Sequence, residues 1–409
     1  MKASFYKNFL ILFSGTTISQ IIPFAAAFVI SRIYTNEEFG FYGLFITIAG
    51  ILAVFGTLKY EVALLISDTE EKSLHIMQTV LLIATTFTFL LFVSIAILIY
   101  MGLLTLPYFM LPLVVFAVAM YTSIDRFYNR YSHYKSMSFL RISKSTSESI
   151  YNVLGSLSLF RPFNLIIGFS GGYLLGIVFF SISQYHFVKK IIIGFSIYNV
   201  KKVMKEYKDF AVYSFPHTLL NTVSTSIPIL LIPYYFDKTT LGLYMFGFKY
   251  IQAPLSLISG SIYNVFGQEL KDCMTERTAR IHAFSSLTKK LMILAILMVP
   301  FLLTAPFFFT LFFGENWTVS GKYIQILTPW IIANFVLSAI SNIPILFEKQ
   351  RQALILEIVY SIVKLLPFVL FAGVFGFDIN EVLIVYVIFT TFVLVYGFYW
   401  NRKLIYGNH

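Results

Sequence analysis

The chain has 409 residues, of which 58% are hydrophobic and only 12% are charged. Soluble domains carry about 25% charged residues, so this composition excludes an ordinary water-soluble protein. The net charge of +11 would suit a nucleic-acid-binding protein, but the distribution of the basic residues argues against that function. The single cysteine, Cys273, excludes an intrachain disulfide and is expected to be a reduced thiol.

Long apolar segments separated by short polar stretches recur along the whole chain. Most reach the roughly 20 residues that an α-helix needs to cross a bilayer, and they lack the alternation of a barrel strand. The first segment starts like a signal peptide but continues without a convincing cleavage site, so we expect a retained helix. The sequence therefore predicts an all-α polytopic membrane protein. Its twelve transmembrane helices are expected at 8–32, 40–66, 74–101, 106–127, 145–160, 164–188, 211–236, 240–266, 284–313, 321–346, 352–376 and 379–400.

Basic residues gather at alternate connections between the predicted helices, and this bias marks the cytoplasmic side. The opposite side holds only Arg32, Arg161, Lys238 and Lys322. Both termini are therefore expected in the cytoplasm, and the positive charge is a topology signal rather than a nucleic-acid site. The cytoplasmic set is Arg126, Arg130, Lys135, Arg141, Lys144, Lys189, Lys190, Lys201, Lys202, Lys205, Lys208, Lys271, Arg277, Arg280, Lys289, Lys290, Lys349, Arg351, Arg402 and Lys403.

The two halves of the chain share an internal repeat. YKNF (6–9) returns as YKDF (207–210), and EEFGFYGLF (37–45) returns as TTLGLYMFG (239–247). Each match falls at the same place in its six-helix set. Such parallel repeats are related by a pseudo-two-fold axis along the membrane normal, with the site between them. We predict six-helix lobes at 1–195 and 211–409, joined by a cytoplasmic linker at 196–210.

The region around this linker, KKIIIGFSIYNVKKVMKEYKDF (189–210), is basic and amphipathic. This pattern favours a segment that lies on anionic phospholipid headgroups. A regulatory or partner-binding helix is the alternative.

No metal-ligand cluster, phosphate-binding glycine loop or nucleophile elbow is recognisable, so we expect no catalytic residue, metal or cofactor. The informative residues are ionisable ones inside the predicted helices, because such residues are costly in a membrane. Lys364 lies about 12 residues into the eleventh helix, which is about 18 Å deep, and Pro367 follows one turn later. The position favours a polar cavity that binds an anion, with a structural ion pair as the alternative.

Five further ionisable residues are candidates. Lys249 lies about 13 Å from the outer end of the eighth helix, where a structural and an anion-binding role are equally consistent. Lys59 and Glu61 are near the cytoplasmic end of the second helix, and two residues of spacing should point them to different sides. Arg32 closes the first helix, and for these three interfacial anchoring is at least as consistent as ligand contact. His217 is expected to be packed rather than to carry protons. Because most of the buried charge is positive, an anionic ligand is favoured.

Several stretches resemble one transporter family. ISRIYTNEEFGFYGLF followed by LKYEVALLI, and later YKDFAVYSFPHTLLN, LGLYMFGFKYIQAPLSLISGSIYNVF and FFGENWTVSGKYIQIL, are similar to Wzx-type oligosaccharide flippases. These belong to the multidrug/oligosaccharidyl-lipid/polysaccharide (MOP) exporter superfamily. The resemblance implies two six-helix lobes around a central cavity that opens alternately to each side. Arg32, Lys59, Glu61 and Lys249 lie inside the quoted motifs, whereas Lys364 does not.

The resemblance also implies the cargo and its route. The cargo would be an undecaprenyl-diphosphate-linked oligosaccharide, moved from the cytoplasmic to the outer leaflet of a bacterial cell membrane for surface polysaccharide such as O-antigen. Lys249, Arg32 and Lys59 would line the diphosphate and glycan cavity, and Glu61 or His217 could couple transport to an ion. Lys364 is placed in the same cavity by its depth in the membrane alone. A polysaccharide polymerase and chain-length machinery are the implied protein partners.

Three other functions compete with this interpretation. A cation-coupled multidrug exporter of the same superfamily should bury a carboxylate deep in the first lobe, and the first helix has none. A lipid II flippase of the same superfamily is disfavoured too, because such relatives usually carry two helices more than the twelve predicted here. A membrane-embedded polysaccharide polymerase or glycosyltransferase usually presents a large outer loop with catalytic residues, but here the longest outer connection, around FFGENWTVSG, offers only Glu315. A transporter without enzymatic activity is therefore favoured.

Overall fold

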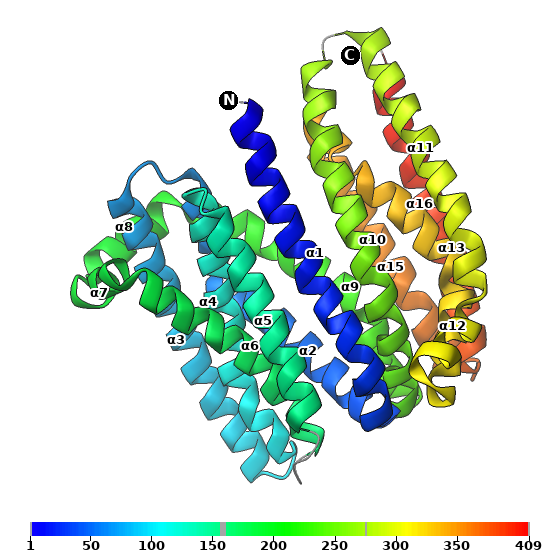
Figure 1. Ribbon diagram of the computed structural model, residues 1–409, viewed down its shortest axis with the longest axis horizontal. Helices are drawn as coiled ribbons and strands as arrows, with labels where there is room; N and C mark the ends of the chain where they lie inside the picture. Colours follow the sequence, from blue (N-terminus) through cyan, green and yellow to red (C-terminus); the bar gives the residue numbers. More distant parts are fainter. Residues whose placement is uncertain (1, 156–160, 275, 408–409) are drawn as a thin grey trace. The chain divides into compact units, whose positions relative to one another are not determined.

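The computed structural model describes residues 2–155, 161–274 and 276–407, and within these ranges every regular element is helical (Figure 1). The elements are α1 (Lys2–Ile33), α2 (Asn36–Thr57), η1 (Tyr60–Ile66), α3 (Glu70–Tyr100), η2 (Leu106–Met110), α4 (Leu111–Arg130), α5 (Tyr134–Leu154), α6 (Arg161–Ser183), α7 (Tyr185–Ile193), α8 (Ile197–Glu206), η4 (Phe210–Ser214), α9 (Phe215–Tyr235), α10 (Lys238–Asp272), α11 (Arg277–Leu303), α12 (Ala305–Phe313), η5 (Glu315–Trp317), α13 (Thr318–Ala339), α14 (Ile343–Leu346), α15 (Gln350–Leu366), η6 (Pro367–Ala372) and α16 (Ile379–Tyr406).

Ten segments of the described chain are helical, long and apolar enough to cross a membrane, so the protein is a multi-pass membrane protein. They correspond to ten of the twelve predicted spans. The other two predictions, the fifth and the eighth, coincide with α5 and α10, which are helical but carry more polar residues. The end predicted for the fifth span, 156–160, lies outside the described residues.

Several predicted boundaries were wrong, each for a local reason. The second span was predicted to reach residue 66, but α2 ends at Thr57 because Leu58 and Lys59 adopt positive φ angles of 46° and 65°. The span predicted at 284–313 divides at Thr304 into α11 and α12, since Pro306 starts a new helix. The largest error is α5, which begins 11 residues before the predicted start at residue 145 and turns a predicted basic loop into a packed helix.

The chain divides into two compact units. The first contains Met1–Tyr34 and Phe41–Val223, and the second contains Thr35–Gly40 and Ser224–His409. In the first unit α5 packs between α1 and α6, and α3 and α6 pack against α4. In the second unit α13 is central and packs against α10, α11, α12 and α16.

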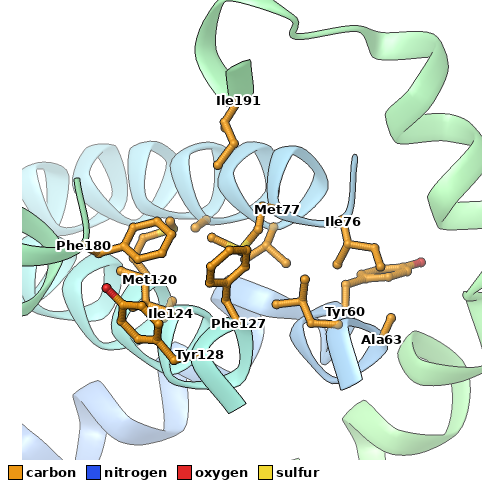
Figure 2. Close-up of a cluster of buried hydrophobic side chains, with 14 of the residues drawn as sticks. Tyr60, Ala63, Ile76, Met77, Met120, Ile124, Phe127, Tyr128, Phe180 and Ile191 are labelled. Carbon is orange, nitrogen blue, oxygen red and sulfur yellow. The ribbon is translucent and has the colours of Figure 1, made fainter. Parts of the chain in front are cut away.

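The hydrophobic core of the first unit gathers apolar side chains from η1 and from α3 to α8 (Figure 2). Phe127 lies at its centre, with its ring 4.6 Å from that of Phe187 and 5.3 Å from that of Phe180. Because η1 contributes fully buried residues, this short helix is fixed to the bundle rather than free in a loop. The labelled members are Tyr60, Ala63, Ile76, Met77, Met120, Ile124, Phe127, Tyr128, Phe180 and Ile191.

In the second unit the starts of α2 and α10 cross at two glycines. A Cβ atom on Gly40 would overlap the carbonyl oxygen of Lys238, and one on Gly242 would overlap the carbonyl oxygen of Asn36. Both positions therefore require glycine for close backbone approach. The two glycines are 202 residues apart, so the contact pairs equivalent positions of the sequence repeat.

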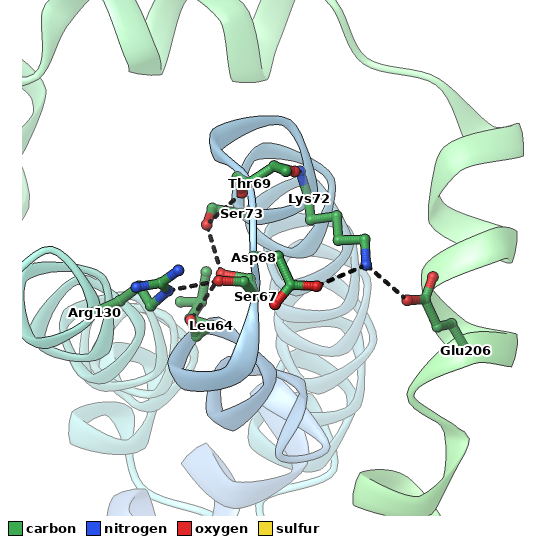
Figure 3. Close-up of polar contacts among 8 residues, drawn as sticks. All are labelled: Leu64, Ser67, Asp68, Thr69, Lys72, Ser73, Arg130 and Glu206. Carbon is green, nitrogen blue, oxygen red and sulfur yellow. Dashed lines mark hydrogen bonds and ion pairs between the residues drawn. The ribbon is translucent and has the colours of Figure 1, made fainter.

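Within the first unit, polar contacts join the segment after α2 to α4, and join α7 and α8 to α3 and the residues before it. Lys72 donates to Asp68 at 3.4 Å and forms an ion pair with Glu206 of α8 at 3.6 Å (Figure 3). Arg130 Nε donates to the carbonyl of Ser67 at 2.6 Å. Gln78 Nε2 donates to the carbonyl oxygens of residues 191 and 194, at 3.1 and 2.8 Å, where α7 ends.

Candidate functional site

Lys364 is a buried lysine in the last turn of α15. Its side chain is only 3% exposed, and most of the neighbouring positions along this helix carry apolar side chains. Pro367 follows and begins the π-helical segment η6, because a proline without an amide hydrogen cannot continue the regular bonding pattern. The sequence thus places a cation immediately before an irregular turn in a membrane helix.

Hydroxyl and aromatic groups of the second unit surround the ammonium of Lys364. Nζ donates to Ser224 Oγ of α9 at 3.2 Å. It also lies 3.9 Å from the ring centroid of Tyr360, one turn earlier on α15. The Tyr360 hydroxyl accepts a hydrogen bond from Trp330 Nε1 of α13 at 2.8 Å, which fixes the ring. The cation is therefore held by a dipole and a π-face.

Among the described residues, no carboxylate oxygen lies within 4.0 Å of the Lys364 ammonium. The structural ion pair considered from the sequence is therefore not formed here. The Glu357 carboxylate, two turns earlier on α15, interacts with this ammonium only from beyond contact distance. A buried cation with no carboxylate in contact keeps an electrostatic preference for an anion. This arrangement can accept an anionic ligand without first breaking an ion pair.

Lys249, the second predicted cation of this unit, lies half-buried in α10. Its ammonium is 5.7 Å from the ring centroid of Tyr250. This contact is longer than that of Lys364 with Tyr360, and the side chain remains partly open. Partial snorkelling, as expected from the sequence, is consistent with this position.

Lys59 and Glu61 form an ion pair at 3.0 Å, which corrects the prediction that they point to different sides. The prediction assumed a continuous α-helix, whereas the left-handed backbone at Lys59 turns its side chain back toward Glu61. The Lys59 side chain is 17% exposed and that of Glu61 is 1% exposed. Glu61 Oε2 is buried without a hydrogen-bond partner in the described structure. Lys59 is therefore already engaged by a carboxylate.

Arg32 and His217 differ from both lysine sites. Arg32 is exposed in the last turn of α1, and its Nη1 donates to the carbonyl of Phe28 in the same helix. His217 lies in the first turn of α9 and is exposed, so the prediction that it is packed was wrong. Arg32, Lys59, Glu61 and His217 belong to the first unit, whereas Lys249 belongs with Lys364 to the second.

The sequence reasoning missed two ion pairs inside the first unit. Lys144 Nζ lies 3.2 Å from Glu148 on the same face of α5, and Glu148 also accepts from the Tyr42 hydroxyl at 3.1 Å. The ring of Tyr173 lies 4.5 Å from the Lys144 ammonium. The spacing i, i+4 of Lys144 and Glu148 could have revealed this pair if α5 had been placed correctly.

The second missed pair joins α5 to α4. Arg141 donates through two nitrogens to Asp125, at 3.1–3.2 Å, and through Nη1 to Thr16 of α1 at 2.9 Å. Arg141 had been assigned to the set of basic loop residues that predicted topology. Its bidentate pairing explains instead how a charged residue is tolerated in a helix bundle.

Comparison with known proteins identifies relatives of the whole fold. The family model described as "Polysaccharide biosynthesis protein" matches residues 5–266, more than half of the chain. The capsular polysaccharide biosynthesis protein CapF of Staphylococcus aureus is 26% identical over 329 residues, which are 76% of this chain and 75% of CapF.

Solved structures agree on the fold. The lipid II flippase MurJ in an inward closed conformation superposes with a TM-score of 0.67 at 16% identity, covering 96% of this chain and 87% of MurJ. An inward-facing multidrug resistance MATE family transporter of the MOP superfamily gives a TM-score of 0.62 at 14% identity, covering 96% and 94%. Together with the family match, these findings confirm the resemblance read from the sequence.

Proposed function

The chain belongs to the polysaccharide biosynthesis protein family, and from this premise we propose that it is a flippase for polyprenyl-diphosphate-linked oligosaccharides. It moves an undecaprenyl-diphosphate oligosaccharide from the cytoplasmic to the outer leaflet of a bacterial cell membrane by alternating access. In this proposal twelve helices, α5 and α10 included, span the membrane as two lobes, 1–195 and 211–409, with both termini in the cytoplasm. The residues 196–210 link the lobes.

The observation that carries the proposal is the buried ammonium of Lys364 without a carboxylate partner. A diphosphate supplies the missing negative charge, and the Ser224 hydroxyl can reorient to donate to a phosphate oxygen. A membrane potential negative inside favours outward movement of the anion by about 2.3 kcal/mol per charge per 100 mV. The same site would reject an organic cation.

Access to this ammonium requires movement, since it is 3% exposed. The π-helical segment η6 begins three residues after Lys364, and α9, which carries Ser224, contains Pro228 and Pro233. Prolines and π-helical turns are the usual places where a membrane helix bends. We propose that bending of α15 at Pro367 opens Lys364 to the substrate.

The other predicted residues take secondary roles in this proposal. Lys249 is the second cation for the diphosphate because it is half-buried and accessible. Lys59 and Arg32 would join only after leaving Glu61 and the α1 backbone respectively. Glu61, with one unpartnered carboxylate oxygen, is a better candidate for ion coupling than the exposed His217.

Two kinds of partner accompany the substrate. Anionic phospholipids suit the surface of α7 and α8, where Ile192, Ile193 and Tyr198 are exposed among lysines. A polysaccharide polymerase and chain-length machinery would receive the flipped oligosaccharide, as the resemblance implies.

A cation-coupled multidrug exporter is the second candidate, and one observation favours it. Glu148 is a buried carboxylate inside the first unit, the feature that this function requires, although it lies on α5 rather than on the first helix. Its charge is matched by Lys144, whereas an exporter of cations needs a carboxylate that is free to receive them. We therefore rank this function below the flippase.

The test is a flipping assay with labelled undecaprenyl-diphosphate oligosaccharide in proteoliposomes. Wild type, Lys364→Ala and Lys364→Arg are compared at equal amounts of folded protein. We expect transport by wild type, loss in the alanine variant and partial activity in the arginine variant. Transport of organic cations but of no lipid-linked glycan by wild type would overturn the proposal.

A further inference from the structure

The helix α5 is unusually polar for its position. It packs between α1 and α6 in the first unit, yet it is too polar to count among the ten apolar spans. Its sequence contains the run RISKSTSES (141–149). Each polar side chain of a helix in an apolar bundle needs a hydrogen-bond or charge partner, because unsatisfied polar groups are costly there.

The charges of α5 are accounted for by neighbouring helices. Arg141 turns toward Asp125 and Thr16, and Lys144 turns toward Glu148, which also contacts Tyr42. These contacts occupy the sides of α5 that face α1, α2, α4 and α6. No member of either ion pair lies on the remaining side.

That remaining side borders an open surface hollow of about 820 Å³. Its side chains recur every three to four residues, so they form one stripe of the helix. From residue 139 to residue 151 this stripe is about 18 Å long at 1.5 Å per residue. Three hydroxyls occupy its middle turns, with apolar and aromatic side chains above and below. The principal members are Phe139, Ser143, Thr146, Ser147, Ile150 and Tyr151.

We propose that this stripe is the surface on which the glycan part of the substrate lies during transport. It rests on the proposed flippase function and deepens it, because it assigns the sugar part of the substrate to a surface within the first unit. The stripe carries no charge, so it does not suit a diphosphate. Sugars are neutral polyols with apolar ring faces, and they match hydroxyls flanked by Tyr151, Phe139 and Ile150. A lipid tail would leave the three hydroxyls without a polar partner outside their own helix.

The first experiment uses the single native cysteine as an advantage. In a Cys273→Ser background, Ser147→Cys places a thiol in the stripe. Ser94→Cys on α3 is the control, because Ser94 lies among the exposed apolar side chains of Phe92, Val93 and Ile97 in an apolar span, where lipid should keep out a charged reagent. Both are treated in proteoliposomes with a small membrane-impermeant methanethiosulfonate. We expect Ser147→Cys to react and Ser94→Cys not to react. Undecaprenyl-diphosphate oligosaccharide should slow the reaction at least fivefold, and glycan-free undecaprenyl diphosphate should not.

Other outcomes overturn the inference. An unreactive Ser147→Cys would mean that lipid or the second unit covers the stripe. Equal protection by the glycan-free lipid would assign the stripe to the diphosphate or the tail, and no protection would mean that no ligand lies there.

The second experiment separates this inference from the proposed function. The triple variant Ser143→Ala/Thr146→Val/Ser147→Ala keeps the shape of the stripe and removes its hydroxyls. We expect it to flip the full oligosaccharide lipid about tenfold more slowly than wild type and to keep its rate on a lipid with a single sugar. If wild type flips the full substrate and the triple variant equals it, the stripe inference is wrong although the flippase proposal stands. If wild type flips neither lipid, the flippase proposal itself fails.

Discussion

Replacing Lys364 by methionine should separate stability from transport. In the folded protein the ammonium gains a charged hydrogen bond to Ser224, about 1.5–3 kcal/mol, and a cation–π contact with Tyr360, about 2 kcal/mol. Against this stands the cost of burying an ion, about 3 kcal/mol at a membrane helix centre on insertion scales. Methionine keeps most of the volume and contacts the ring through sulfur. The opposing contributions differ by about 2 kcal/mol at most, so we expect the unfolding free energy to change by no more than that.

Transport should respond very differently to the same substitution. At about 4 Å and an effective dielectric constant of 20, the attraction between the ammonium and one phosphate charge is about 4 kcal/mol. Each 1.4 kcal/mol is a factor of ten, so the loss can approach a thousandfold. Unfolding is measured in detergent micelles and flipping in proteoliposomes, with Lys364→Arg as the variant that retains the charge. A methionine variant that is destabilised by 3 kcal/mol or more, yet transports normally when folded, would refute the reasoning.

Three further predictions concern other parts of the molecule. Gly242→Ala should destabilise the protein by about 1–3 kcal/mol or more, because the added Cβ meets a backbone carbonyl. Gly260→Ala is the control and should not destabilise it, because the space around Gly260 is open. Thermal unfolding in micelles compares the two variants. Lys59→Met should cost about 3–5 kcal/mol by leaving the buried carboxylate of Glu61 unpaired, and an unchanged melting temperature would show that the pair contributes nothing. Burial raises the pKa of the Cys273 thiol, so the rate of maleimide labelling should keep rising with pH above about 8.5, where an ordinary thiol levels off.

The sequence predicted the helices best where apolar runs are long and proline or glycine ends them. It failed for α5, because serines and charges interrupt the hydrophobic pattern of this helix, and two of those charges find partners on other helices. Asp125 lies 16 residues from Arg141, and Tyr42 lies 106 residues from Glu148. Hydropathy alone cannot report such pairs. A polar helix that is satisfied by its neighbours is therefore read as a loop.

The environment of Lys364 was predictable in part. Its depth in the eleventh predicted helix indicated burial, and Tyr360 at i−4 necessarily shares its face. Ser224, 140 residues away, could only be found from the fold. The pairing of Lys59 with Glu61 depends on the left-handed backbone of Leu58 and Lys59. Neither residue is a glycine, so the local sequence did not predict this turn.

The crossing of α2 and α10 at Gly40 and Gly242 has the form of an isologous interface contained in one chain. In a symmetric dimer a residue on the two-fold axis meets its own copy, so a single substitution acts twice at one contact. Here the two copies occupy separate positions, and each glycine faces the carbonyl that precedes the other by four residues. Drift at either position is therefore opposed by a backbone that the other half supplies. The contact thus has the reciprocity of a dimer interface within a single chain.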